Sequence, residues 1–289
     1  MRLLLSVFAC VYAGSLLVMA MYCAQKGGLQ RLGAYSVIGL ALACIGLTVY
    51  QLRHPWQVDG VMRRLMITMG WFYGAILLGA WAQKLVGAPG PSVGQMVIGS
   101  LSFQGAAVFL AVPFVREHDI TWQEAFGFTN SGSRALLLGV MIGCIFLPLG
   151  WGLQWLSGEI MVHLPQLQLK PREQEVVHTV QMASNWSQWV VLGVITILLA
   201  PAGEEILFRG ILYPWLRKTG YRRLALWSTA LIFGAIHFNL VTFVPLTVLA
   251  LALALLYERT ENLLAPIAAH SVFNAVNFAQ LYFIQKTVG

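Results

Sequence analysis

The feature that most constrains this chain is a series of nine apolar runs joined by shorter polar links. They cover residues 3–24, 32–52, 65–86, 93–115, 134–156, 188–216, 221–238, 241–257 and 263–283. About 20 mostly apolar residues are enough for a helix to cross the hydrocarbon core of a bilayer. The sequence therefore predicts an all-α, polytopic membrane helical bundle with about eight to nine transmembrane helices.

The composition supports this class. Hydrophobic residues make up 58% of the 289 residues and charged residues only 10%, whereas soluble domains carry about 25% charged residues. The net charge is +7, but the basic residues lie in short links between apolar runs, which favours a lipid bilayer over nucleic acid as the partner. The four cysteines have no paired spacing, so neither a disulfide framework nor a zinc knuckle is expected.

The distribution of basic residues predicts an orientation. With a cytoplasmic N-terminus, 12 of the 18 Lys and Arg residues fall on the cytoplasmic side, as the positive-inside rule favours. The run 3–24 is about twice as long as the apolar part of a signal peptide, so a retained anchor is favoured over a cleaved leader. The result is a multi-pass integral membrane protein.

The polar stretch 157–187 divides the chain. It contains Pro165 and Pro171 and is expected to be an extramembrane loop with some helix. We therefore predict an N-terminal membrane region, residues 1–186, with about five spans and this loop, and a C-terminal membrane core, residues 187–284.

The run 188–216 contains two adjacent acids and an arginine. Ionisable residues at bilayer depth are costly, rare and usually functional. Glu205 and Arg209 are spaced i, i+4, with the acid first, as a helical ion pair prefers. Glu204 lies about 100° further round the helix, so it is expected to face a cavity. Pro201 predicts a break in the helix just before the acids.

Polar residues of the following runs reach the same layer. At about 1.5 Å per residue, Glu204, His237 and Asn274 each lie about 20 Å from the nearest charged helix end, and His270 about 13 Å. His270 and Asn274 share a helix face by their i, i+4 spacing, as do Phe233 and His237. These polar side chains of three helices are therefore expected to converge.

Three motifs carry a resemblance to a known family. They are E-E-x-x-x-R at Glu204, Glu205 and Arg209, F-x-x-x-H at Phe233 and His237, and H-x-x-x-N at His270 and Asn274. Residues from about 192 to 278 resemble the CAAX-protease and bacteriocin-processing (CPBP, or Abi) family by the order and spacing of these motifs. The resemblance implies an intramembrane endopeptidase of a bacterial inner membrane, open to the cytosol, whose partner is a membrane-anchored protein or peptide substrate.

The residue types suit peptide hydrolysis, which needs an activated water, stabilisation of an oxyanion and a proton for the leaving amine. Glu204 is the candidate general base, and His237 is expected to orient or polarise the water. His270 and Asn274 are candidates for donating hydrogen bonds to the oxyanion. Glu205, Arg209 and Phe233 are expected to support these four catalytic residues structurally.

The metal dependence is open, because the family has been described both as zinc metalloproteases and as metal-free glutamate proteases. The sequence has no H-E-x-x-H helix, the compact arrangement of zinc ligands and base. Glu204, His237 and His270 could form a three-ligand zinc site with an open position. Metal-free general-base chemistry is favoured, and no cofactor other than a possible zinc ion is expected.

Two other classes of function remain. The chain could be a non-catalytic membrane scaffold or bacteriocin-immunity protein that keeps the polar residues as a packed ion pair. It could also be a transporter with a proton relay, which predicts interrupted spans in both halves of the chain. Only the C-terminal half carries buried acids, which disfavours a transporter.

Overall fold

The computed structural model describes residues 119–128, 131–163, 174–183, 185–218 and 220–288, and twelve single positions between 93 and 116. The chain divides into two compact units, Met1–Gly74 and Ala75–Gly289, and all described residues belong to the second. The described elements are all helical: α5 (Trp122–Phe126), α6 (Gly132–Val162), α7 (Glu175–Gln181), α8 (Trp186–Val194), η2 (Ile195–Leu199), α9 (Ala200–Glu205), η3 (Ile206–Leu212), α10 (Tyr213–Arg217), α11 (Arg222–Ala235), α12 (Leu240–Thr260) and α13 (Leu264–Val288).

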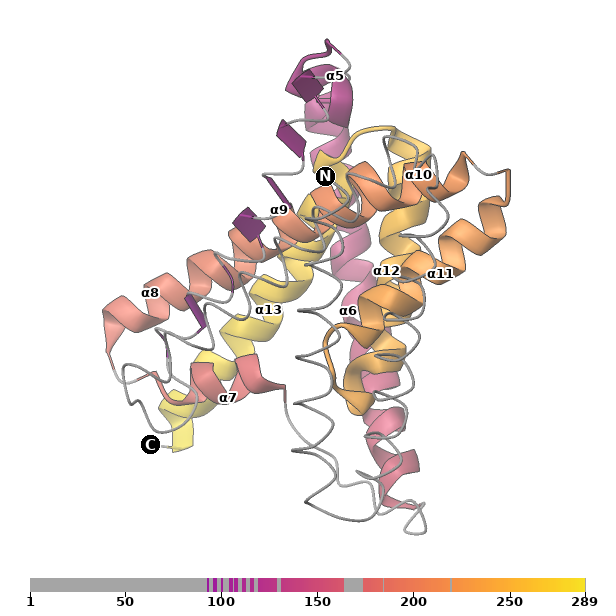
Figure 1. The fold of residues 1–289 in the computed structure, drawn as a ribbon. Coiled ribbons are helices and arrows are strands. Elements are labelled where there is room, and N and C mark those ends of the chain that lie inside the picture. Colours follow the sequence, from indigo (N-terminus) through magenta and orange to yellow (C-terminus); the bar gives the residue numbers. More distant parts are fainter. Residues whose placement is uncertain are drawn as a thin grey trace, which may run out of the picture. The chain divides into compact units, whose positions relative to one another are not determined.

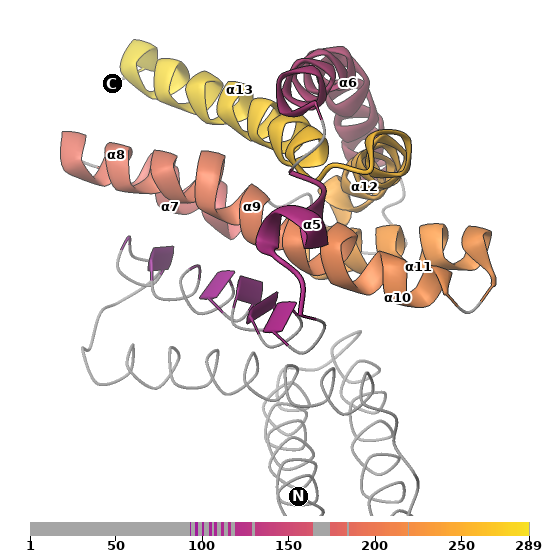
Figure 2. The ribbon, with the colours of Figure 1, turned by 90° about the horizontal axis from the view of Figure 1, so that it is seen from above.

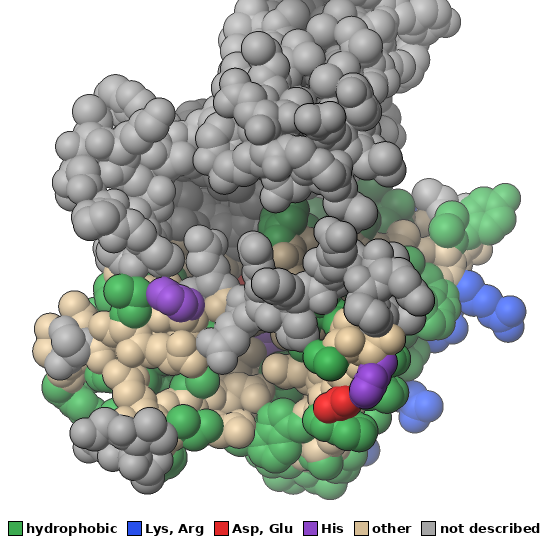
Figure 3. Space-filling view, turned by 90° about the horizontal axis from the view of Figure 1, so that it is seen from below, with side chains coloured by type: hydrophobic (Ala, Val, Ile, Leu, Met, Phe, Trp, Pro, Cys, Tyr) green, Lys and Arg blue, Asp and Glu red, His purple; other side chains and the backbone are tan. Residues whose placement is uncertain are grey.

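Within the described residues, three helical segments are long and apolar enough to cross a membrane, namely Gly132–Val162, Trp186–Arg217 and Leu240–Thr260. The first of these, α6, turns large apolar side chains outward, among them Leu137, Ile145 and Trp155, which are 61%, 65% and 67% exposed. Figure 3 shows several groups of green hydrophobic side chains on one face, separated by tan atoms and with few charged side chains. Exposed large apolar side chains of this kind are typical of a surface that faces lipid.

Two runs predicted as spans are not among these segments. The run 221–238 folds as α11, whose 14 residues reach about 21 Å, less than the about 30 Å of a hydrocarbon core. The run 263–283 folds as α13, which has 25 residues but carries polar side chains such as His270 and Asn274 along its length. The expected count of eight to nine transmembrane helices is therefore not reached by the described part of the chain, and the runs 3–24, 32–52 and 65–86 lie outside it.

Residues 186–217 form one rod in which two π-helical turns interrupt the α-helix (Figure 1). Each π-helical turn precedes a segment with a proline in its first turn, Pro201 in α9 and Pro214 in α10. Proline lacks an amide hydrogen, and its ring collides with the carbonyl four residues earlier in a regular α-helix. The wider π-helical turn absorbs this mismatch, so the break expected at Pro201 takes the form of η2.

The core lies among α6, α11, α12 and α13. Phe233 of α11 and Leu249 and Leu253 of α12 are completely or almost completely buried there, and Phe146 packs edge-on against Phe273 at 5.8 Å between ring centroids. Figure 2 shows α6, α12 and α13 gathered beside the rod, with α11 next to α12. This arrangement holds α11 and α13 against the part of the rod that carries the two glutamates.

Candidate active site

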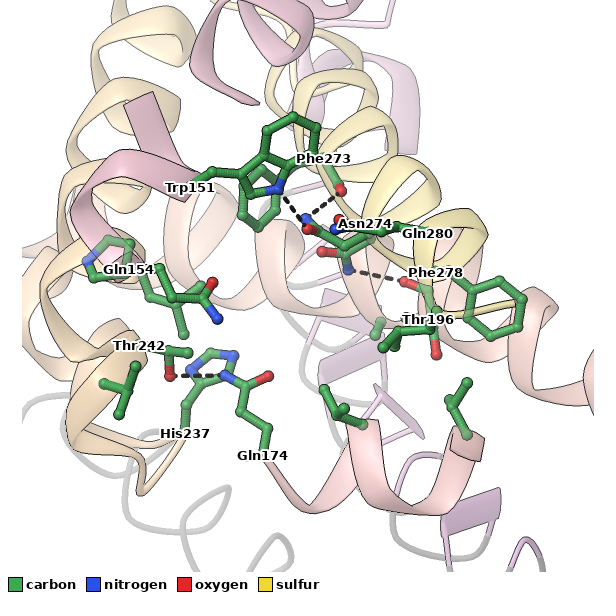
Figure 4. A pocket seen from close by; sticks show the side chains of 18 of the residues that line it. Trp151, Gln154, Gln174, Thr196, His237, Thr242, Phe273, Asn274, Phe278 and Gln280 are labelled. Carbon is green, nitrogen blue, oxygen red and sulfur yellow. Dashed lines mark hydrogen bonds between the residues drawn. The ribbon is translucent and has the colours of Figure 1, made fainter. Parts of the chain in front are cut away.

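A cavity of about 930 Å³ lies beside the rod and collects the side chains that the sequence singled out. Glu204, His237, His270 and Asn274 all line it, and Figure 4 shows His237 and Asn274 on opposite walls. Glu205 and Arg209 lie behind the wall, 0% and 2% exposed. The fold therefore brings the four candidate catalytic residues to one cavity from three elements, the rod, the end of α11, and α13.

Helical spacing explains the two long walls. Thr196, Ala200 and Glu204 recur at intervals of four residues along the rod and line the cavity, so they share one face. Asn274 of α13 reaches Thr196 while His270 reaches Glu204. The two helices therefore run antiparallel across the cavity.

Glu205 and Arg209 form the expected ion pair. Nη1 of Arg209 donates to Oε1 of Glu205 at 2.7 Å, and Nη2 donates to the carbonyl of Ala250 in α12 at 2.8 Å. The guanidinium also lies 4.9 Å from the centroid of the Phe233 ring, a cation–π distance. Arg209 thereby ties the rod to α11 and α12.

His270 joins this pair, which the sequence did not predict. Its Nδ1 lies 3.0 Å from Oε1 of Glu205. Since a carboxylate paired with a guanidinium can only accept, Nδ1 of His270 carries the hydrogen. The other ring nitrogen, Nε2, points toward Oε2 of Glu204 at 3.9 Å, so the imidazole bridges the two glutamates.

Glu204 is placed differently from its neighbour. Its side chain is 13% exposed, and it lines the cavity. Its Oε2 is buried and has no hydrogen-bond partner among the described residues. A buried carboxylate oxygen next to a cavity is a strong binding position for a water molecule or a substrate hydrogen.

His237 lies just after α11, where its Nδ1 is 2.7 Å from the carbonyl of Phe233. A carbonyl only accepts, so this bond places the hydrogen on Nδ1 and leaves the Nε2 lone pair of the neutral ring available. The Phe233 ring is completely buried and contacts both imidazoles, with centroids 5.0 Å from His237 and 5.7 Å from His270. Phe233 thus spaces the two histidines.

Asn274 donates a hydrogen bond to a backbone carbonyl that has no donor within the rod. In η2 the amide of Ala200 bonds the carbonyl of Ile195, and the next amide in that pattern belongs to Pro201, which has no hydrogen. The carbonyl of Thr196 is therefore short of a donor, and Nδ2 of Asn274 supplies it at 2.9 Å. The second hydrogen of this amide nitrogen remains for other partners.

The zinc set does not fit the observed geometry. Among the residues that the structure describes, no group of three or more His, Cys, Asp and Glu side chains lies close enough to hold a metal ion. Glu204 and His270 approach one another, but His237 does not complete a cluster with them. We therefore derive no step through a metal ion.

Several lining residues were not predicted. Gln174 donates to Oγ1 of Thr242 at 2.8 Å, and Trp151 donates to Oδ1 of Asn277 at 2.9 Å, both on the wall of the cavity (Figure 4). Gln104 lines the cavity as well and is 4% exposed. In the sequence it does not stand out, because Gln95, Ser100 and Ser102 are also neutral polar residues within the apolar run 93–115.

The comparisons with known proteins agree with the motifs. Residues 186–276 match the family described as type II CAAX prenyl endopeptidase Rce1-like. The uncharacterized protein YpbD of Bacillus subtilis (strain 168) is 38% identical over 93 residues, which are 31% of this chain and 44% of YpbD. The match thus spans less than half of that relative, and no solved structure matches the chain.

The matched segment contains Glu204, His237, His270 and Asn274. It also contains the whole rod 186–217, which is long and apolar enough to cross a membrane. The family expected from the motifs is confirmed for this segment. Residues 186–276, about a third of this integral membrane protein, are therefore similar to the type II CAAX prenyl endopeptidase Rce1-like family.

Proposed function

We propose that the protein is an intramembrane endopeptidase that cleaves a membrane-associated protein or peptide with a water activated by Glu204. One observation carries the proposal: Oε2 of Glu204 is buried without a partner among the described residues, on the wall of the cavity that His237, His270 and Asn274 also line. The family match supports a CAAX-type substrate class. We place the protein in a bacterial cell membrane, with a cytoplasmic N-terminus.

The two glutamates have different partners, and this difference supports the role of Glu204 as the base. Glu205 is engaged by Arg209 at 2.7 Å and by His270 at 3.0 Å, so it is neutralised and held. Glu204 and Glu205 together carry two negative charges against the single positive charge of Arg209. The imidazole of His270, whose Nε2 lies 3.9 Å from Oε2 of Glu204, is a polar group beside the second of these charges.

In the reaction, Glu204 takes a proton from the bound water while the water oxygen bonds to the carbonyl carbon of the scissile peptide. The carbonyl π electrons move to the oxygen and form a tetrahedral oxyanion. Glu204 then gives the proton to the leaving nitrogen as the carbon–nitrogen bond breaks. The sum is one peptide bond and one water converted to a carboxyl and an amine.

The other residues stabilise charge and hold protons. The free hydrogen of Asn274 Nδ2 is the candidate donor to the oxyanion, because the other is used by the carbonyl of Thr196. His237, with Nδ1 fixed by Phe233, offers Nε2 to orient the water. His270 is held beside Glu204 by the hydrogen bond between its Nδ1 and Glu205. Each such donor or acceptor contributes most in a dry, preorganised cavity.

The cavity also suits an apolar, membrane-associated peptide. Beside its polar residues it is lined by Trp151, Trp155, Phe273 and Phe278. Aromatic and aliphatic walls with a few placed polar groups are typical of sites that bury a ligand.

The test is cleavage of an internally quenched, prenylated peptide ending in a CAAX sequence, using purified protein in detergent. Glu204→Gln keeps the size of the side chain and removes the base, so it should lower the turnover rate by about 10²–10⁴-fold. Glu159 is a matched control, because it also lines the cavity but is half-exposed and pairs with His163. Glu159→Gln should cleave like the parent.

The non-catalytic alternative predicts a different result. If the residues serve only packing, Glu204→Gln lowers the melting temperature and no variant, nor the parent, cleaves the peptide. Cleavage by Glu204→Gln at the parental rate would rule out the proposed mechanism.

A further inference from the structure

Gln104 is a buried polar residue that no step above uses. The residue is 4% exposed, and its Oε1 has no hydrogen-bond partner among the described residues. It lies in a helical stretch outside the segment 186–276 that the family match covers. An unpaired buried carboxamide is costly and calls for a ligand or water that pairs with it.

Several described positions of the stretch around Gln104 lie close to the rod. Positions 104, 107, 111 and 115 are all buried and share one helix face, and the other three are Ala107, Ala111 and Val115. Ala111 and Val115 belong to an apolar cluster that contacts Ile206 of the rod. On a face that is otherwise small and apolar, packing alone would favour another apolar residue at position 104.

Gln104 packs against Gly203, the residue that precedes Glu204. A Cβ built on Gly203 would overlap Oε1 of Gln104, and it would lie 3.1 Å from the Cα of Gln104. Gly203 therefore allows the carboxamide to reach the residue that precedes the candidate base. Both Gln104 and Glu204 line the cavity, and each presents a buried oxygen without a partner in the described part of the chain.

We propose that Gln104 is a positioning residue that holds, together with Glu204, the water that attacks the peptide. This inference rests on the proposed function. Both orphan atoms are acceptors, so one water can donate one hydrogen to Glu204 and the other to Gln104. When Glu204 removes its proton, the remaining O–H stays bonded to Gln104 and the oxygen lone pair faces the carbonyl carbon. A neutral amide does this without competing for the proton.

The first test compares Gln104→Met with Gln285→Met in the prenylated-peptide assay. Methionine keeps the length of glutamine without its polar atoms, so Gln104→Met should lower kcat by about 10-fold or more while KM changes by less than about twofold. Its melting temperature should not fall, because an unpaired polar group is removed.

Gln285 is the matched control. Its Oε1 is likewise buried and unpaired within the described residues, but it does not line the cavity and its Nε2 donates to the carbonyl of Gln181 at 2.9 Å. Gln285→Met should therefore lose stability and keep kcat, the opposite of Gln104→Met.

A second variant covers the case in which Gln104→Met does not fold. Gln104→Glu places another carboxylate next to Glu204, so the acidic limb of the kcat/KM profile should move to higher pH. Parental kcat in Gln104→Met, or an unshifted profile in Gln104→Glu, overturns the assignment. If Glu204→Gln is inactive in the same experiment, the proposed function stands and only the role of Gln104 falls. If the parent cleaves no peptide, both fall together.

Discussion

Nδ1 of His270 lies 3.0 Å from the carboxylate oxygen of Glu205 that also accepts the 2.7 Å hydrogen bond from Arg209. One oxygen atom thus joins α13 to the rod, and Arg209 extends the link to the carbonyl of Ala250 in α12. This series of contacts runs from Arg209 through Glu205 to His270 and ends at Glu204, whose Oε2 lies 3.9 Å from Nε2 of His270. The orientation of His270 next to Glu204 therefore depends on the ion pair of Glu205 and Arg209, although neither of these two residues lines the cavity.

Removing Arg209 should destabilise the whole helical core. Arg209→Met leaves Glu205 buried, charged and short of its main partner, which costs about 3–5 kcal/mol when a buried pair is broken. The double variant Glu205→Gln with Arg209→Met should recover part of that loss, because no charge is stranded. Thermal unfolding in detergent measures both, and an Arg209→Met protein as stable as the parent would contradict the buried ion pair.

Asn274 and Pro201 should be energetically coupled. Asn274→Ala leaves the carbonyl of Thr196 without its 2.9 Å donor, an expected loss of about 1–3 kcal/mol. Pro201→Ala restores an amide hydrogen that can reach this carbonyl, so in that background Asn274→Ala should cost clearly less. A double-mutant cycle on melting free energies checks this, and strict additivity would contradict the assigned role of Asn274.

Two glycines of α6 should be intolerant of any side chain. A Cβ at Gly139 would overlap the carbonyl of Ala265, and one at Gly143 would lie 2.7 Å from the carbonyl of Ala269, so backbone rather than a mobile side chain stands in the way. Gly139→Ala should therefore cost about 1–3 kcal/mol. Gly152 lies in the same helix with no atom within 4 Å of its built Cβ.

Gly152→Ala is thus the control for that experiment. It should be neutral or stabilising by up to about 1 kcal/mol, because alanine is the better helix former. Equal melting temperatures for Gly139→Ala and Gly152→Ala would mean that α6 and α13 do not pack as described.

The short helix α5 should be sensitive to acid. The backbone amide of Thr121, and then its hydroxyl, donate to Glu124 and hold the pKa of that carboxyl below its ordinary value. A lowered pKa in the folded state means that the contribution is present above the ordinary carboxyl pKa and is lost as pH falls through the folded value. Hydrogen exchange of the 122–126 amides, corrected for intrinsic rates, should show less protection in acid.

Glu124→Gln removes this titration. In that variant the corrected protection of α5 should no longer change across the acidic range. An identical pH response in the parent and in Glu124→Gln would assign the effect to another group.

The amount that could be predicted from the sequence differs between the fold and the candidate site. The apolar runs predicted an all-helical membrane protein, and the motif spacing predicted the family, because both depend on local periodicity. The expectation that the run 221–238 spans the bilayer is not confirmed, because α11 has 14 residues and ends at Ala235, a boundary that hydropathy does not indicate. The helix turns at that point and places His237 at the cavity.

The sequence by itself determined which residues are costly to bury. Glu204, Glu205, Arg209, His237, His270 and Asn274 stand out because each is polar at a depth where water is scarce. Their i, i+4 spacing also determined that Arg209 can pair with Glu205, since that contact is made within one helix.

Only the tertiary structure decided which partner each of these residues contacts in another part of the chain. It assigned His270 to Glu205 and Asn274 to the carbonyl of Thr196, and it placed Gln104 against Gly203. These contacts join residues far apart in the chain, so they follow from how the helices pack and not from any local pattern. Packing left Glu204 as the acid with an unpaired oxygen at the cavity because Arg209 and His270 had already satisfied its neighbour.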